Sequence, residues 1–173
     1  PIYFIDTGYH FPETIEYKNY LQKYLKIHII DISPNLDMAN QLNSNNRLLF
    51  TSNTDRCCEI NKTKPLNRIM NMHDVWITGI RHDQTNYRKN TTSVQHLQNG
   101  KLKYNPIIKW TQNNVQEFIQ FFNLPKHPLD NENISSIGCQ PCTRFHQDQK
   151  RESNRWPGQT KTECGLHLNY MDK

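Results

Sequence analysis

The chain has 173 residues, of which 35% are hydrophobic and 21% charged, a size and composition typical of one globular domain. It has no run of the roughly 20 apolar residues that a bilayer-spanning helix needs, so we expect no membrane association. Lys and Arg outnumber Asp and Glu by 21 to 16, but they are scattered rather than clustered. We therefore expect no nucleic-acid partner. The excess charge favours a small anionic ligand or a basic surface that only aids solubility.

The first third of the chain predicts a strand, a helix and a second strand. Ile2–Ile5 has the apolar run of a buried strand and ends in Asp6-Thr7-Gly8. Pro12 is typical of a first helical turn, and one apolar face at helical spacing follows it, formed by Tyr17, Tyr20, Leu21 and Tyr24. Ile27–Ile32 predicts the second strand. A helix between two strands predicts that the strands are parallel.

The middle of the chain predicts short elements separated by polar loops. Pro34–Leu42 predicts a weaker helix, and residues 43–54 a surface loop or a frayed helix. A segment of helical propensity runs from Cys57 to Met72. Val75–Thr78 predicts a third strand, after which Arg81–Asn90 is a polar loop.

The last predicted elements are a hairpin and a helix. Val94–Leu97 and Leu102–Tyr104 flank Asn99-Gly100, a strong hairpin signal. A helix starts near Thr111, and its regular apolar spacing predicts a face packed into the core, formed by Val115, Phe118, Ile119 and Phe122. Little periodicity follows Pro125. We expect a single α/β domain over residues 1–173, with an open, mostly parallel sheet, flanking helices and an irregular Cys-rich C-terminal tail.

The five cysteines point to metal binding rather than to a disulfide framework. Their number is odd, and neighbouring Cys57 and Cys58 cannot easily bond to each other. Cys139-Gln-Pro-Cys142 is half of a zinc site, half of an iron–sulfur site or a redox pair. Two adjacent thiolates suit a [4Fe–4S] cluster, in which each binds a different iron, although zinc and free thiols remain alternatives.

Cys164 is a candidate nucleophile near the end of the chain. Lys161 and His167 favour its thiolate, and Gly165 gives the segment backbone freedom, although a lone thiol is usually inert. Loop arginines are candidate ligands of sulfate or phosphate oxygens, or else solvated surface charge: Arg81, Arg88, Arg144, Arg151 and Arg155.

Taken together, these motifs resemble the adenylyl-sulfate (APS) reductase branch of the assimilatory APS/PAPS reductase family. The matching stretches run through the chain in the family's order: Phe4 to Thr14, Cys57-Cys58 with Lys62, Thr78 to Gln84 with Arg88, Ser136 to Arg144, Arg155-Trp156, and the tail Glu163-Cys-Gly-Leu-His167. The resemblance implies an adenine nucleotide alpha-hydrolase-like fold.

The resemblance also implies an activity and a site. Such an enzyme reduces APS to sulfite and AMP through an S-sulfocysteine, here on Cys164, with thioredoxin or a glutaredoxin as electron donor. A [4Fe–4S] cluster would be held by Cys57, Cys58, Cys139 and Cys142. Substrate contacts would come from Asp6, Thr7, Gly8, Lys62, Arg81, Arg88 and Arg155. We expect the four paired cysteines to converge and Cys164 to lie apart from them or to be disordered.

Several expectations concern the protein as a whole. The family's Ser-Gly-Gly/Ala-x-x-Ser phosphate loop should precede Ile2 and is not in this sequence, which predicts a weak catalyst. No thioredoxin-like domain follows Cys164, so a separate donor is implied. We expect a location in the cytoplasm or plastid stroma and a possible homo-oligomer. A PAPS reductase and a non-catalytic iron–sulfur-binding remnant of the family are the alternatives.

Overall fold

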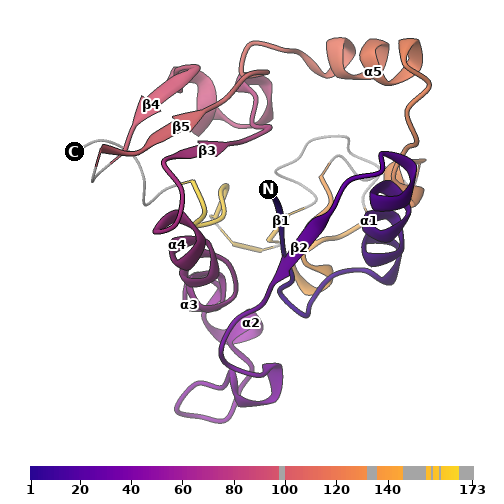
Figure 1. Ribbon diagram of the computed structural model, residues 1–173. Helices are drawn as coiled ribbons and strands as arrows, with labels where there is room; N and C mark the ends of the chain where they lie inside the picture. Colours follow the sequence, from indigo (N-terminus) through magenta and orange to yellow (C-terminus); the bar gives the residue numbers. More distant parts are fainter. Residues whose placement is uncertain (98–99, 132–135, 146–154, 157, 160, 168–173) are drawn as a thin grey trace.

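The computed structural model describes residues 1–97, 100–131, 136–145, 155–156, 158–159 and 161–167. Its first unit is the predicted strand, helix and strand: β1 (Ile2–Ile5), α1 (Pro12–Tyr24) and β2 (Ile29–Ile32). The two strands are parallel, with Ile2 opposite Ile29. Lys18 of α1 forms an ion pair of 2.6 Å with Asp31 of β2, so the helix is fixed beside the strand it precedes (Figure 1).

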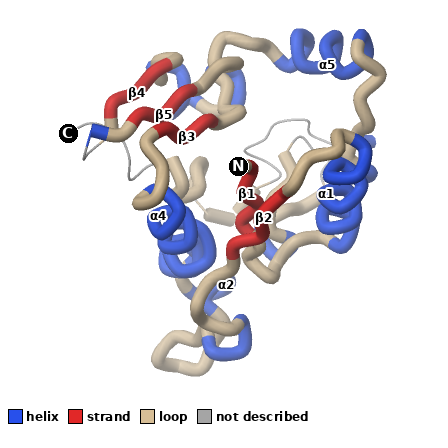
Figure 2. Tube along the Cα trace, viewed as in Figure 1, coloured by secondary structure: helices blue, strands red, loops and turns tan. Residues whose placement is uncertain are grey.

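A second sheet lies beside the first and contains three strands (Figure 2). β3 (Val75–Ile77) is parallel to β5 (Leu102–Tyr104), and β5 is antiparallel to β4 (Val94–His96). The β4–β5 pair is the predicted hairpin. The α/β class and the parallel pairing are therefore confirmed, and the described strands are divided between two sheets.

Helices connect the two sheets. α2 (Leu49–Ser52), α3 (Thr54–Cys58) and α4 (Lys64–Met70) follow one another, with a π-helical turn, Glu59–Thr63, between the last two. The predicted helical segment after Cys57 is thus confirmed.

The predicted helix over Pro34–Leu42 is wrong. Of this stretch, one 3-10 turn forms, Met38–Asn40. The Gln41 side chain donates a hydrogen bond of 2.9 Å to the Leu36 carbonyl oxygen. In a helix, the Leu36 carbonyl oxygen would accept a hydrogen bond from a backbone amide. The Gln41 side chain takes the place of that amide, so the backbone stays in a loop.

α5 (Gln112–Phe121) begins after Thr111, whose hydroxyl caps the helix by accepting a hydrogen bond from the Asn114 amide. The predicted core packing of its apolar face is wrong, since no residue of α5 is buried and Phe121 is 82% exposed. The helix stands at the edge of the molecule (Figure 1). Its aromatic rings pack on each other instead, with the Phe118 and Phe122 centroids 4.5 Å apart.

One apolar cluster joins both sheets to the C-terminal tail. Buried Leu66, Met70 and Leu97 contact three partly buried residues, Ile5 of β1, Trp76 of β3 and Leu166 of the tail. The tail therefore packs where α4 and the two sheets meet. Shorter 3-10 turns complete the described elements: His82–Gln84, Asn86–Asn90, Pro128–Asn131 and Gln140–Cys142. Among the described residues, no helix has the length and apolar character required to cross a membrane.

Candidate functional site

The four paired cysteines line one pocket, as predicted from their spacing and from the family resemblance. Each is only 6–9% exposed. Other side chains share the pocket wall: Tyr9, Phe50, Asn61, Lys62 and Pro141. Segments more than 80 residues apart in sequence thus present four thiols and one lysine to a common space.

Two local structures aim the cysteines into this pocket. Cys57 and Cys58 end α3, and the π-helical turn that follows widens the helix where Lys62 projects. Cys139 precedes the 3-10 turn and Cys142 ends it, and the Gln140 amide donates a hydrogen bond of 2.7 Å to the Tyr9 carbonyl oxygen. The loop after β1 therefore holds the second pair in place.

A buried amide pair supports Cys57. Asn61 and Gln41 are 1% and 0% exposed and exchange two hydrogen bonds, of 2.6 and 2.8 Å. Asn61 also donates to the Cys57 sulfur at 3.4 Å. Burial and the neighbouring Cys58 thiol raise the pKa of Cys57 to about 11, although the Asn61 bond acts in the opposite direction. A free thiol is thus disfavoured as thiolate here, and a bound cation would reverse this balance.

Lys62 is the cation that lines the cysteine pocket. Burial lowers its pKa, but the thiolates of Cys139, Cys164 and Cys58 together raise it above the ordinary value. Lys62 therefore carries a positive charge beside both the cysteine pocket and Cys164, the arrangement expected where an anion is to be held.

Among the described residues, no three Cys, His, Asp or Glu side chains are arranged around a single metal-ion position. Zinc needs four ligands that converge on one ion. A cubane differs because each cysteine binds a separate iron, so the four sulfurs lie around a larger group. The four buried thiols that line one pocket match the donor set that an iron–sulfur cluster needs.

Cys164 does not lie apart from the cysteine pocket, so that expectation is wrong. Its half-buried side chain packs against the cluster formed by Cys139, Cys142 and Trp156. The tail is anchored on both sides of Cys164, by Glu163 on Arg88 and by His167, whose ring stacks on Trp76 with centroids 5.3 Å apart.

Arg155 lies next to this pocket and contacts the main chain of Cys142. It is 6% exposed, its guanidinium lies 4.5 Å over the Trp156 ring, and its Nε donates to the Cys142 carbonyl oxygen at 3.3 Å. Gly138 lies against the same guanidinium, so any side chain there would displace it. Trp156 itself has a φ of 46°, a left-handed backbone that a bulky residue rarely adopts.

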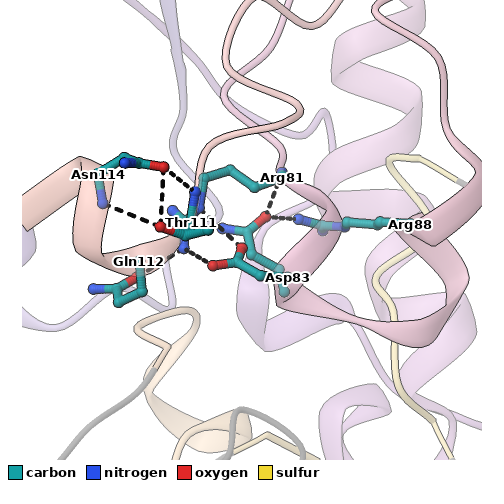
Figure 3. Close-up of polar contacts among 7 residues, drawn as sticks. Arg81, Asp83, Arg88, Thr111, Gln112 and Asn114 are labelled. Atoms are coloured by element: carbon teal, nitrogen blue, oxygen red, sulfur yellow. Dashed lines mark hydrogen bonds and ion pairs between the residues drawn. The ribbon is translucent and has the colours of Figure 1, made fainter.

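The other predicted arginines are engaged elsewhere. Arg81 donates hydrogen bonds to Asp83 at 3.0 Å and to Gln112 at 2.7 Å (Figure 3). Arg88 donates to the Gln84 side-chain oxygen of the same loop. Arg88 is buried and holds Glu163. Arg151 lies outside the described residues. Of the predicted cationic ligands, Lys62 lines the cysteine pocket and Arg155 lies next to it.

The Asp6-Thr7-Gly8 turn lies at the carboxyl end of β1. The Gly8 amide bonds to the Asp6 carboxylate at 2.9 Å, and Gly8 has a φ of 72° that favours glycine. Met38 Sδ would lie 2.9 Å from any Cβ at Gly8. Thr7 is 1% exposed and faces Cys139, so the turn borders the cysteine pocket.

Comparison with known proteins identifies the family. The model of the phosphoadenosine phosphosulfate reductase domain matches residues 1–145. The chain belongs to the phosphoadenosine phosphosulfate reductase domain family. A relative from Streptomyces coelicolor, named adenosine 5'-phosphosulfate reductase, is 36% identical over 168 residues, covering 96% of this chain and 71% of its own length. One from Gloeobacter violaceus, named phosphoadenosine 5'-phosphosulfate reductase, is 38% identical, covering 95% and 70%.

The fold agrees with this family. The solved phosphoadenylyl-sulfate reductase of Candida auris superposes with a TM-score of 0.67 at 22% identity, covering 80% of this chain and 68% of that one. The adenine nucleotide alpha-hydrolase-like architecture expected from the sequence is thus confirmed.

Sequence reasoning missed several residues of this family member's site. Gln41 and Asn61 are amides in unremarkable stretches, and no spacing indicates that they pair. The position of Glu163 directly before Cys164 in the tail motif could have indicated a role at the site, but its partner, Arg88, is 75 residues away in sequence. Tyr9 had one too, because it follows the turn after β1.

Proposed function

We propose that the protein reduces adenylyl sulfate to sulfite and AMP, with a thioredoxin-type dithiol as electron donor. The observation that supports this most directly is the position of Cys164, half-buried against the cysteine pocket and near the Lys62 cation. The relatives named as APS and PAPS reductases agree with a sulfonucleotide substrate.

The chemistry needs one nucleophile and one donor. The Cys164 thiolate attacks the sulfur of the bound sulfate group, a sulfur–sulfur bond forms, and the sulfur–oxygen bond to the phosphate breaks with its electron pair leaving on AMP. A donor thiolate then attacks the Cys164 sulfur and releases sulfite. The second donor thiol resolves the mixed disulfide, so the donor ends oxidised and Cys164 returns as a thiol.

Lys62 has two tasks in this scheme. Its positive charge lies beside the attacking Cys164 sulfur and would balance the sulfate oxygens of the substrate. Arg155 lies next to the same pocket and adds a second cation. The turn at Asp6–Gly8 would receive the nucleotide, because open α/β sheets bind ligands at the carboxyl ends of their strands. Substrate contacts by Arg81 and Arg88 stay predictions, since both are engaged within the protein.

A [4Fe–4S] cluster would be held by Cys57, Cys58, Cys139 and Cys142. When bound, it would supply a fixed charge beside the reacting sulfur rather than electrons. The burial of the four thiols, and the Lys62 charge beside them, fit such a group. Zinc stays the alternative from the sequence, since two cysteine pairs also provide four zinc ligands.

The test is a single turnover without donor. The protein, purified without oxygen, is mixed with APS, and its tryptic peptides are weighed by mass spectrometry. We expect one sulfite-sized adduct on the peptide that carries Cys164, and about four irons and four sulfides per chain. An adduct on Cys142 would contradict the assignment of the nucleophile, and stoichiometric zinc without iron that of the cluster.

The competing substrate is PAPS, as in the Gloeobacter relative's name. It differs by one 3'-phosphate, so adduct formation with PAPS at equal concentration gives the discrimination directly. Faster reaction with PAPS than with APS would assign the protein to the other branch. If neither compound gives an adduct, the remaining interpretation is a non-catalytic iron–sulfur-binding remnant of the family.

A further inference from the structure

The Glu163 carboxylate is held at both oxygens by one arginine. Arg88 Nε donates to Oε2 at 2.7 Å, and Arg88 Nη2 donates to Oε1 at 2.6 Å. The two residues are each 4% exposed. A paired fork of this kind inside the protein has a fixed geometry, unlike an ion pair in solvent, which exchanges partners freely.

The same carboxylate also fixes the backbone of Cys164. The Cys164 amide donates to Glu163 Oε1 at 3.2 Å, so one oxygen accepts from Arg88 and from the nucleophile's own main chain. The Thr85 hydroxyl donates a further hydrogen bond to Oε2 at 3.4 Å. Rotation of the Glu163 side chain out of this fork would therefore move Cys164 as well.

Arg88 is a rigid receptor for this carboxylate. It lies in the 3-10 helix Asn86–Asn90, and its Nη1 bonds to the Gln84 side-chain oxygen. That oxygen also accepts the Arg81 amide at 3.0 Å, so the arginine is fastened to its own loop independently of the tail (Figure 3). The loop thus provides a preformed site into which the tail docks.

Other contacts of the tail do not act on Cys164 in this way. Lys161 pairs with Asp55, whose side chain is 86% exposed, so water competes for that ion pair. Leu166 packs on an apolar cluster and His167 stacks on an aromatic ring. Such packing fixes the direction of a side chain less strictly than a two-bond fork does. Among the tail contacts described above, the Arg88–Glu163 fork is the directional one that lies next to the nucleophile.

We propose that Glu163 is the positioning residue of Cys164, and that its fork with Arg88 holds the thiol beside Lys62 for attack and must open for the donor to reach it. The attack of Cys164 on a sulfonucleotide rests on the proposed function. The docking of the tail on Arg88 through Glu163 does not. Arg88 in this scheme acts through Glu163 rather than on the substrate. Breaking the fork should expose the Cys164 thiol and slow its sulfonation.

The test compares Glu163→Gln with Asp55→Asn. Both changes replace one carboxylate by an amide in a tail ion pair, but only the first removes the fork. Alkylation of Cys164 by iodoacetamide, without nucleotide, is followed on the tryptic peptide that begins at Thr162 and contains Cys164 as its one cysteine. Rates are taken to their plateau at high pH, because loss of the Glu163 charge also changes the fraction of thiolate.

We expect the plateau rate of alkylation to rise at least about tenfold in Glu163→Gln, because the loss of charge-assisted hydrogen bonds shifts the equilibrium between docked and undocked tail by that factor. In Asp55→Asn the rate should stay within about twofold of wild type. The single-turnover rate of adduct formation with APS should fall by a similar factor in Glu163→Gln. Steady-state kcat should then fall while KM stays nearly constant, because buried Glu163 acts in this scheme through Cys164 rather than by binding the substrate.

Two further variants keep the proposal open to contradiction. Arg88→Lys retains the charge but not the fork and should give intermediate alkylation, which also serves if Glu163→Gln does not fold. Glu163→Asp should recover part of the docking. Unchanged alkylation in both Glu163→Gln and Arg88→Lys would overturn the proposal. If the wild-type protein forms no adduct with APS, the proposed function fails, and the alkylation rates still decide the docking.

Discussion

The Thr7 hydroxyl lies 3.4 Å from the Cys139 sulfur, although 132 residues separate the two in sequence. Thr7 belongs to the turn after β1, where a nucleotide is expected, and Cys139 belongs to the cysteine pocket. A ligand held at the turn would therefore rest against the wall that holds the thiols. The two parts of the proposed site form one unit rather than two neighbouring sites.

Thr7→Val is expected to destabilise the protein with little change in its shape. Valine keeps the volume but removes the hydroxyl that Cys139 contacts and that accepts the Tyr9 amide at 3.2 Å. A buried donor left without a partner costs about 1–3 kcal/mol in the free energy of unfolding. Denaturant unfolding measures it, with Thr7→Ser as the control that keeps the hydroxyl. Equal stability of the two variants would show that the hydroxyl contributes nothing.

Cys164→Ser should abolish sulfite production and leave the iron content unchanged. A serine hydroxyl is not ionised near neutral pH and cannot accept the sulfonyl group, whereas the four pocket thiols remain. Sulfite release and iron per chain are measured on the same sample. Cys142→Ser is the matched variant and should lose iron, since it removes a pocket ligand. Iron loss in Cys164→Ser would instead make Cys164 a ligand.

Gln41→Leu should lower the free energy of unfolding by roughly 2–4 kcal/mol. The substitution removes the partner of the Asn61 amide, which stays buried with unmet hydrogen bonds close to Cys57. Thermal or denaturant unfolding measures the loss. Asn40→Ala, at an exposed position one residue earlier, is the control and should change stability by less than about 0.5 kcal/mol.

Lys103 predicts a pH dependence of stability. Burial and the Arg88 charge lower its pKa to about 8, and Glu163 opposes this only in part. Between pH 8 and its ordinary pKa of 10.5, the unfolded chain binds more protons than the folded one, so the Lys103 contribution makes the protein more stable as pH rises. Below pH 8 the full penalty of the buried charge is present.

Lys103→Met removes that penalty. The variant should be more stable than wild type at pH 7, by at most about 3 kcal/mol, and the difference should shrink as pH approaches 10.5. The difference between the two unfolding free energies at each pH isolates this residue from other groups. A difference that is constant from pH 7 to 10 would show that Lys103 titrates normally.

Local sequence signals predicted the elements that local interactions determine. Ile2–Ile5 has the bounds predicted from its apolar run, Pro12 begins α1, and β4 pairs with β5 as the hairpin signal predicted. The convergence of Cys57 and Cys142 also followed, because paired spacings indicate a shared ligand. Such signals act over a few residues or depend on one known chemistry.

Contacts between distant segments could not be predicted in this way. The apolar face of α5 indicates a need for a partner but not where that partner lies, and in the described structure Phe121 meets mainly solvent and its neighbours. The position of Cys164 was misjudged because it depends on Glu163 reaching Arg88, a pairing that no periodicity encodes. The π-helical turn has no signature in apolar spacing.

The number of residues in that turn, Glu59–Thr63, determines how Lys62 is oriented relative to Cys57. A π-helical turn contains one residue more than the α-helix around it, and each residue of an α-helix turns the chain by about 100°. Deleting one residue from it would allow an unbroken helix from α3 into α4 and would rotate Lys62 relative to Cys57. A single-codon deletion could thus separate the cation from the thiols while every functional side chain is still present.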